Sequence, residues 1–268
     1  MTVSKLTKES IPDIQSKIRK VGKAGNALKV VVYGKSGTGK TTFSGTFPKP
    51  LLHIVCSSIG ANESIPLSKL DKVFDLELDK SQELIQVPDV VMKNGFKTVV
   101  LDHVTGLQDL VLKEIVDLPE SQRTWGTVTQ SQYGQMTIQM KEILRHLLML
   151  PVNVVVIGQE RETVVDEVTG LLTPYVTIAV TPSLGSWLNA AADFILHTYI
   201  REQTVRVKTK VGSNTIELEK PTESYVFSAH IGPNPVFVTK VRTSEIKSLP
   251  ASIDNPSYES LLSLKGKE

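Results

Sequence analysis

The chain has 268 residues, 40% of them hydrophobic and 22% charged, which suits a soluble globular protein built around one large α/β domain. Its 30 basic and 28 acidic residues nearly balance, so the net charge of +2 permits nucleic-acid binding without indicating it. The single Cys56 excludes an internal disulfide framework, and no apolar run approaches the ~18 residues that a membrane helix needs, so we expect a cytoplasmic protein with no membrane partner.

Residues 1–27 are polar and basic, and we expect them to form an N-terminal arm before the core. Ile11, Ile14 and Ile18 lie at helical spacing, which predicts a short amphipathic helix followed by a glycine-containing linker. Such a helix either caps its own domain or docks on a neighbouring subunit, and the sequence leaves both alternatives open.

Residues 28–243 alternate short apolar runs with amphipathic stretches, and we expect them to form the core domain. Several runs are β-branched and continuous, which is typical of strands covered on both faces. Strands that alternate with helices predict a mainly parallel, doubly wound α/β sheet. The predicted strands are 28–33, 51–55, 73–78, 97–102, 153–158 and 192–200, and the predicted helices are 80–93, 105–117 and 131–149.

Beyond residue 200 the apolar and polar residues alternate in the segments RVKTKVGSNTIELEK and YVFSAHIGPNPVFVTKVRT. The Gly-Ser-Asn and Gly-Pro-Asn-Pro interruptions favour antiparallel hairpins at one edge of the sheet. Residues 244–268 contain Pro250 and Pro256, and we expect them to form a loosely held C-terminal tail.

A phosphate-binding motif begins at residue 34, where GKSGTGKT matches the pattern G-x-x-x-x-G-K-[ST]. Its glycines let successive backbone N–H groups point at a β-phosphate, and Lys40 is expected to reach the β- and γ-phosphates. The Thr41 hydroxyl is expected to coordinate Mg²⁺. The β-branched strand before the motif and the helix-compatible segment after it favour a nucleotide site over a fortuitous glycine-rich turn. The residues expected to bind ATP are Gly34, Lys35, Ser36, Gly37, Thr38, Gly39, Lys40, Thr41 and Thr42.

The strand KTVVLD ends in Asp102, which we expect to be the second partner of the metal, although an aspartate closing an ordinary strand is the alternative. Between the P-loop and Asp102 the chain has room for two further strands, 51–55 and 73–78. An additional strand between the P-loop strand and the metal-aspartate strand marks the RecA and motor-ATPase division, whereas simple kinases and small GTPases pair those two strands directly.

The segment GKSGTGKTTFSGTFPKPLL contains a very short helix that Pro-x-Pro cuts off before the second strand. In this respect the chain resembles a bacteriophage family of RecA-like nucleotide-binding proteins, which includes phage single-strand-annealing recombination ATPases. The resemblance continues through KTVVLDHVTGL, NVVVIGQERE, TPSLGSWLNAAADFIL and VFVTKVRTSEIKSLPASIDNP, in consistent order over residues 28–256. It implies a RecA-like fold, ATP and Mg²⁺ as cofactors, and a homo-oligomer in the cytoplasm of a host bacterium.

The resemblance also implies catalytic roles for three residues outside the P-loop. Gln159 is similar to the polar sensor beside the γ-phosphate, with a solvated glutamine at a strand exit as the alternative. Lys240 and Arg242 would lie on one face of an edge strand and reach the nucleotide of the neighbouring subunit, with a solvated strand face as the alternative. His103 follows Asp102 and either orients that carboxylate or packs in the core.

The chain departs from the family where an acidic residue usually polarises the attacking water. After the second strand it carries Cys56, Ser57 and Ser58, and a serine is no general base at neutral pH without help. Glu63 is the nearest replacement. Either Glu63 substitutes or hydrolysis is slow, and we favour nucleotide binding with weak hydrolysis.

Single-stranded DNA is the partner that the resemblance implies, with a single-strand-binding protein as a further partner. The loop after the Asp102 strand offers Arg123, Trp125 and Tyr133, which suit base stacking, although Trp125 is as compatible with core packing. The second expected DNA loop, 160–175, is acidic and its pattern is closer to that of a hairpin. DNA binding therefore depends on the N-terminal lysines and on Arg206, Lys208 and Lys210.

Three hypotheses follow from these features. The first is a RecA-like ATPase that acts on single-stranded DNA in phage recombination or annealing. The second is a P-loop NTPase whose partner is a protein, such as a helicase-loading or regulatory factor, which the acidic segment 160–175 favours. A small-molecule kinase fits worst, because no arginine-rich lid is evident.

Overall fold

The structure, a computed structural model, describes residues 27–56, 71–116, 128–163, 175–211, 214–243 and 249–265, with the backbone alone for 206–221 and 223. The strands are β1 (Lys29–Gly34), β2 (Leu51–Val55), β3 (Val73–Glu77), β4 (Thr98–Asp102), β5 (Asn153–Gly158), β6 (Glu160–Thr163), β7 (Tyr175–Ile178), β8 (Phe194–Val211), β9 (Asn214–His230), β10 (Lys240–Val241) and β11 (Ser252–Asp254). The helices are α1 (Lys40–Ser44), the 3₁₀ helix η4 (Ser81–Ile85), α2 (Val87–Asn94), α3 (Val104–Val116), α4 (Gln130–Leu148), α5 (Pro182–Ala191) and α6 (Tyr258–Lys265).

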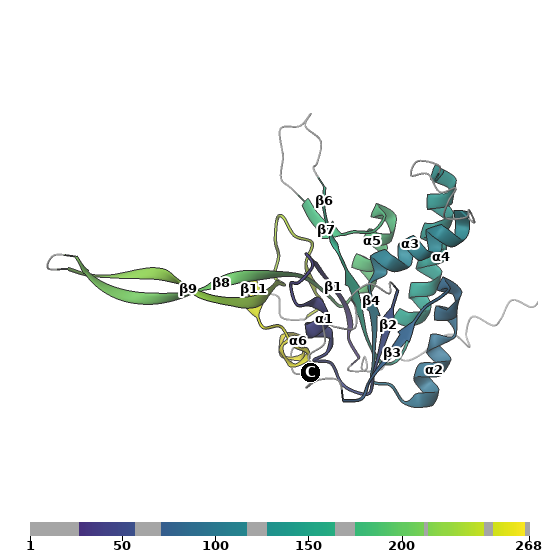
Figure 1. The fold of residues 1–268 in the computed structure, drawn as a ribbon, viewed down its shortest axis with the longest axis horizontal. Coiled ribbons are helices and arrows are strands. Elements are labelled where there is room, and N and C mark those ends of the chain that lie inside the picture. Colours follow the sequence, from purple (N-terminus) through teal and green to yellow (C-terminus); the bar gives the residue numbers. More distant parts are fainter. Residues whose placement is uncertain are drawn as a thin grey trace, which may run out of the picture.

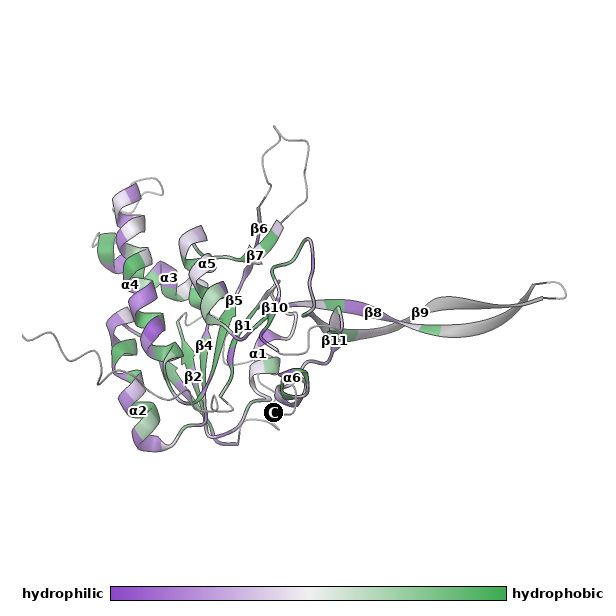
Figure 2. Cartoon of the chain, turned by 180° about the vertical axis from the view of Figure 1, so that it is seen from behind, coloured by the Kyte–Doolittle hydropathy of each residue, from purple (hydrophilic) through white to green (hydrophobic). Residues whose placement is uncertain are grey.

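Nine strands of the described chain form one sheet in the order β11-β9-β8-β1-β5-β4-β2-β3, with β10 paired to β8 (Figure 1). The six strands from β8 to β3 are mutually parallel. Every residue of β2, β4 and β5 is buried and most are apolar, and the hydrophobic colouring of these central strands is visible in Figure 2. The prediction of a mainly parallel, doubly wound α/β sheet is therefore confirmed.

Helices cover both faces of the sheet and close two hydrophobic cores. Helices α2, α3, α4 and α5 pack on one face, where Leu107, Met140 and Leu184 are fully buried. The short helix α1 and the C-terminal helix α6 cover the other face through Phe43 and Leu261. Because strands covered on both sides have no solvent-facing positions, the continuous apolar runs in the sequence fit this architecture.

A strand lies between the P-loop strand β1 and the Asp102 strand β4, as expected for the RecA division. That strand is β5, which comes later in the chain than both of its neighbours. The two strands that the sequence offered for this place, 51–55 and 73–78, instead form β2 and β3 on the far side of β4. The order of strands in a sheet is a long-range property, and the position of a run in the chain does not determine it.

One long antiparallel ribbon forms the edge beyond β1. Strand β8 begins in the sheet beside β1, continues past it and pairs with β9 from His197 to Val211. Figures 1 and 2 show this ribbon extending away from the rest of the molecule. The second predicted hairpin is absent from the described residues, because the chain after His230 returns and β10 pairs with the beginning of β8.

Two further expectations concern segment 160–175, whose pattern is close to that of a hairpin, and the C-terminal tail, and they have different outcomes. Segment 160–175 begins and ends in β6 and β7, which pair antiparallel, so the hairpin interpretation of its pattern is confirmed. The expectation of a loosely held tail is wrong for residues 249–265. Strand β11 pairs with β9, Leu261 is fully buried, and Tyr258 packs against Phe47. None of the helices in the described parts of the chain combines the length and the apolar character that crossing a bilayer requires.

Candidate nucleotide-binding site

The P-loop joins β1 to α1 and lies at the carboxyl ends of the parallel strands. Gly39 adopts φ +84°, in the left-handed region, and α1 begins at the next residue. A Cβ at Gly34 would lie 2.5 Å from the carbonyl oxygen of Thr198 on β8, so a side chain has no room there. The hydroxyls of Thr38 and Thr198 lie 2.8 Å apart and fasten the loop to β8. The turn expected between a strand and a helix is present, with Ser36 and Gly37 inside it and Thr42 in α1.

Lys40 lies across the P-loop, where its Nζ donates to the carbonyl oxygens of Gly34 at 2.9 Å and Lys35 at 2.6 Å. Burial lowers the pKa of Lys40, while Asp102 and Glu160 act in the opposite direction. An ammonium group held inside the curve of the loop is placed to meet phosphate oxygens there, because a phosphate oxygen accepts more strongly than a carbonyl oxygen.

Thr41 and Asp102 meet as predicted for a metal site. The Thr41 Oγ1 donates to Asp102 Oδ2 at 2.9 Å, and Asp102 is nearly buried at the end of β4. A hydroxyl that donates its proton to a carboxylate keeps its lone pairs for a cation. Mg²⁺ prefers oxygen ligands and is usually held by one or two protein groups together with water and phosphate, so these residues fit it.

A buried histidine that the sequence gave no reason to select also contacts Asp102. His53, in the middle of the apolar strand β2, places its Nε2 3.2 Å from Asp102 Oδ2 and its Nδ1 3.1 Å from Asp75 Oδ1. Burial favours the neutral ring, but the hydrogen bonds and charges of the two carboxylates outweigh it and raise the pKa of His53. The ring of His103 accepts from the Gly106 N–H at the start of α3 through its Nδ1, and its predicted role in orienting Asp102 stays a prediction.

Gln159 and Glu160 follow β5, the strand that lies between the P-loop strand and the Asp102 strand. The Gln159 side chain is exposed, and its role as a γ-phosphate sensor stays a prediction. Glu160 accepts from His197 Nε2 at 2.8 Å and lies 3.9 Å from the Nζ of Lys35 in the P-loop. The sequence offered Glu160 only as one acidic residue among several in a loop, so its proximity to the P-loop was missed.

Cys56 follows β2 and is the first of the three residues, Cys56 to Ser58, at the place where the resemblance led us to expect an acidic residue that polarises water. Its thiol is buried, which raises its pKa, so it stays protonated and cannot accept a proton from water. The backbone N–H of Cys56 donates to the carbonyl oxygen of Asp102. Ser57, Ser58 and the replacement candidate Glu63 lie outside the described residues.

Lys240 lies in β10, Arg242 directly follows this strand, and both side chains contact the C-terminal end of α5. The Nζ of Lys240 donates to the carbonyl oxygens of Asn189 and Ala190, and Arg242 pairs with Asp193 at 3.0 Å. Cations at this place stabilise the end of a helix. That Lys240 and Arg242 reach the nucleotide of a neighbouring subunit stays a prediction.

The structure describes the candidate DNA-binding residues only in part. Arg123 and Trp125 lie outside the described residues, whereas Tyr133 lies exposed on α4. For Lys208 and Lys210 only the backbone is described, and it places them on β8 opposite Glu217 and Thr215 of β9.

Phe227 is a further residue that the sequence did not select. The residue is 45% exposed, and its ring packs so closely on the P-loop that a Cβ at Gly39 would lie 3.0 Å from it. An exposed aromatic face beside a phosphate-binding loop is suited to stack on a nucleobase. The sequence indicates this role only weakly. The alternation in YVFSAH places the Phe227 ring on one face of a strand, but it does not show that this face packs against the P-loop.

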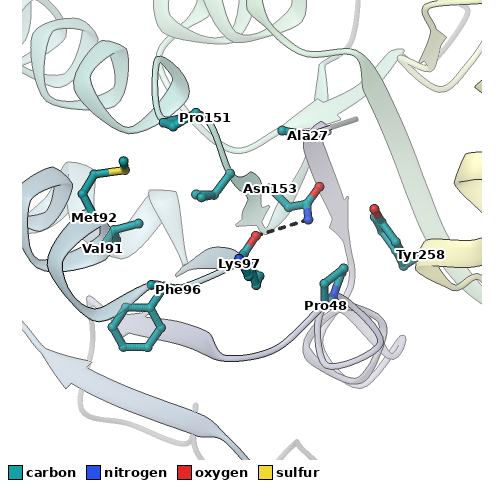
Figure 3. A pocket seen from close by; sticks show the side chains of 11 residues that line it. Ala27, Pro48, Val91, Met92, Phe96, Lys97, Pro151, Asn153 and Tyr258 are labelled. Carbon is teal, nitrogen blue, oxygen red and sulfur yellow. Dashed lines mark hydrogen bonds between the residues drawn. The ribbon is translucent and has the colours of Figure 1, made fainter. Parts of the chain in front are cut away.

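The pocket in Figure 3, of about 470 Å³, lies at the opposite end of the strands from the P-loop. Ala27 lines it two residues before β1 and Lys97 directly before β4, and Asn153, the first residue of β5, donates to the carbonyl oxygen of Lys97. The pocket is therefore separate from the nucleotide site.

Comparison with known proteins identifies the family. The sequence model of the AAA_24 family, described as an AAA domain, matches residues 26–226. No curated protein matches the chain. Two solved structures are similar to it: a KaiC-like protein from the hyperthermophilic archaeon Pyrococcus horikoshii OT3 and the flagellar accessory protein FlaH from Methanocaldococcus jannaschii. The first is 13% identical over 76% of this chain and 85% of that one, with a TM-score of 0.36. The second is 10% identical over 77% of this chain and 86% of that one, also with a TM-score of 0.36. With its P-loop and its inserted strand β5, the chain belongs to the AAA_24 family of AAA domains and is a RecA-like P-loop ATPase domain.

Proposed function

We propose that this ATPase domain binds Mg²⁺ and ATP, hydrolyses ATP slowly, and uses the nucleotide to control its hold on single-stranded DNA in phage recombination or annealing, as a homo-oligomer. The observation that carries the nucleotide part is the meeting of Lys40, Thr41 and Asp102 at one end of the sheet. A cation and two oxygen donors beside an N–H-lined turn are the parts that a magnesium triphosphate requires.

The residues of the site have distinct tasks in this proposal. Backbone amides of the P-loop bind the phosphates, and Lys40 exchanges the Gly34 and Lys35 carbonyl oxygens for phosphate oxygens. Thr41 and Asp102 would hold Mg²⁺, which would supply neutralisation of phosphate charge. The protonated thiol of Cys56 cannot activate water, and this supports slow hydrolysis.

A direct connection between this site and the ribbon supports nucleotide control of a partner. Thr198 of β8 pairs with Gly34 in the sheet and contacts Thr38 of the P-loop. The same strand continues into the β8–β9 ribbon, whose pairing shifts register between Glu202 and Thr204. A change in the P-loop that moves Thr198 therefore acts on the base of a ribbon that extends away from the core.

A protein partner is the second candidate, and the register of the ribbon favours it. Arg206 lies opposite Glu219 and Lys208 lies opposite Glu217, so each of these cations has an acidic residue as its cross-strand neighbour. Neighbouring carboxylates weaken the attraction to a phosphate backbone. The ribbon would then bind a protein such as a replication or regulatory factor.

Anisotropy of fluorescent oligo-dT separates these candidates. The full chain is titrated into the oligonucleotide at 50 and 200 mM salt, with Mg²⁺ and either ATP or no nucleotide, and Lys40→Ala serves as the control. Binding that depends on ATP, weakens with salt and disappears in Lys40→Ala supports the DNA proposal. No binding at low salt with ATP present contradicts it and favours a protein partner.

A further inference from the structure

A line of hydrogen bonds crosses three neighbouring strands and ends at the magnesium site. Asp75 on β3 contacts His53 on β2, His53 contacts Asp102 on β4, and Asp102 accepts from Thr41 in α1. The three separations are 3.1, 3.2 and 2.9 Å. The sheet register builds this line, because β2 pairs with both β3 and β4 and His53 lies directly opposite Asp75.

The exposure of the side chains is higher at Asp75 than at His53 and Asp102. The His53 side chain is fully buried, whereas the Asp75 side chain is 47% exposed at the edge strand of the sheet. Asp102 is nearly buried. The line therefore connects an accessible carboxylate to the buried carboxylate that we place at the metal.

The orientation of the ring follows from its partners. Both ring nitrogens of His53 face carboxylate oxygens, and an ionised carboxylate only accepts hydrogen bonds. Asp75 thus holds one edge of the ring while the other edge meets Asp102. The oxygen of Asp102 that faces His53 is the same Oδ2 that accepts from Thr41, so rotation of this carboxylate would break both contacts.

We propose that His53 is a positioning residue for magnesium: it holds the Asp102 carboxylate in the orientation that Thr41 and the metal share, and Asp75 holds the His53 ring. This inference rests on the proposed function. Outer partners that orient metal-binding groups act in this way, and their loss typically costs about 10- to 100-fold in metal affinity. A side chain that only filled space at position 53 would need no contact with Asp102, and an aliphatic one would avoid the cost of burying a polar ring.

The test compares His53→Gln, His53→Leu and Asp75→Asn with the wild-type chain. Glu77→Gln, which removes one carboxylate two residues further along β3, is the matched control. Three quantities are measured: the melting temperature without ligand, the ATP dissociation constant in EDTA, and the Mg²⁺ concentration that gives half of the magnesium-dependent tightening of ATP binding. The last quantity reports the metal site without requiring turnover.

We expect His53→Leu to raise the half-saturating Mg²⁺ concentration by about tenfold or more, with smaller increases for His53→Gln and Asp75→Asn. The ATP dissociation constant in EDTA should stay at the wild-type value in all three variants, and Glu77→Gln should match the wild type throughout. Partial retention in His53→Gln is expected because an amide N–H₂ can replace one ring donor.

Two results would overturn the inference. An unchanged half-saturating Mg²⁺ concentration in the His53 variants would show that Asp102 needs no support from the ring. A loss of ATP affinity in EDTA as large as the loss with Mg²⁺ would show that His53 only maintains the fold. Should His53→Leu not fold, Asp75→Asn decides, because its side chain lies at the surface. Failure of the wild-type chain to bind ATP with Mg²⁺ would instead remove the proposed function itself.

Discussion

Thr41 Oγ1 lies 2.9 Å from Asp102 Oδ2, although the two residues are 61 positions apart in the chain. The contact forms because the P-loop and the end of β4 lie at the same edge of a parallel sheet, with β5 between their strands. It places a hydroxyl and a carboxylate where a magnesium triphosphate would need them, and it gives the first prediction.

Thr41→Val should remove the magnesium-dependent part of ATP binding while leaving ATP binding in EDTA near the wild-type value. Valine keeps the shape of threonine but has no oxygen for the metal or for Asp102. Titration calorimetry with ATP, with Mg²⁺ and with EDTA, measures both parts. Thr137→Val is the matched control, because Thr137 lies on α4 and donates to its own helix backbone. Equal magnesium dependence in Thr41→Val and the wild type would remove Thr41 from the metal site.

Phe227→Ala should weaken ATP binding by about 1–3 kcal/mol, the usual contribution of a base stacked on an aromatic ring. Binding of inorganic tripolyphosphate, which has no base, should not change. Competition of both ligands against a fluorescent ATP analogue separates the two effects. Tyr225→Ala, which removes the more exposed ring two residues away on β9, is the control. Equal losses for ATP and tripolyphosphate would place Phe227 in support of the P-loop rather than beside a base.

Lys29→Met should remove a pH dependence of stability at alkaline pH. Burial lowers the pKa of Lys29 from 10.5 to about 8, although Asp193 opposes the shift. Between these values the unfolded chain holds more protons than the folded chain, so Lys29 makes the free energy of unfolding rise with pH from about 8 to 10.5. Below pH 8 the amine is protonated in both states and its contribution is constant.

Urea unfolding of the wild type and of Lys29→Met at pH 7.5, 9 and 10.5 checks this prediction. The stability difference, wild type minus variant, should increase with pH. Lys93→Met, at an exposed position in α2, removes the same charge and should show no such increase. A difference that does not change with pH would mean that Lys29 stays protonated in the folded chain.

Arg242→Ala should abolish ATP turnover yet leave the fold intact, because the exposed pair with Asp193 contributes at most about 1 kcal/mol. If Arg242 acts on the nucleotide of the neighbouring subunit, mixing this variant with Lys40→Ala should restore activity. About a quarter of the wild-type turnover is expected in an equal mixture, since that fraction of interfaces combines an intact P-loop with an intact arginine. A mixture as inactive as its components would contradict the shared site.

Glu63→Gln should leave the slow turnover within about twofold of the wild type, because we expect no efficient general base in this chain. A positioned carboxylate base typically contributes about 10²- to 10⁴-fold, so its loss would be obvious in a phosphate-release assay. A large decrease in turnover with unchanged ATP affinity would identify Glu63 as the base and would replace slow hydrolysis with ordinary hydrolysis.

The parts of the fold that follow local rules could be predicted from the sequence. Continuous β-branched runs become buried parallel strands, and the motif at residues 34–41 becomes the loop between β1 and α1. The meeting of Thr41 and Asp102 could also be predicted, because the carboxyl ends of parallel strands share one edge. These properties depend on residue type and short spacing.

Properties that depend on neighbours far away in the chain could not be predicted. The identity of β5 as the inserted strand, and the return of the chain after His230 to β8, are decided by pairing between distant segments. His53 looks like one polar interruption in an apolar strand until β3 and β4 supply its partners. Prolines 250 and 256 suggested a loose tail, but Leu261 finds a place in the core beside α1.

Because β8 contacts the P-loop at Thr198 and extends to Val211, with one register shift between Glu202 and Thr204, the ribbon can act as a lever with its pivot at the P-loop. From Thr198 to Val211 the strand spans roughly 40 Å at about 3.3 Å per residue. A tilt of about 5° at the pivot would therefore displace its outer end by roughly 3–4 Å. A rearrangement no larger than a hydrogen bond at the phosphates would reach a distant surface as a movement large enough to open or close a contact.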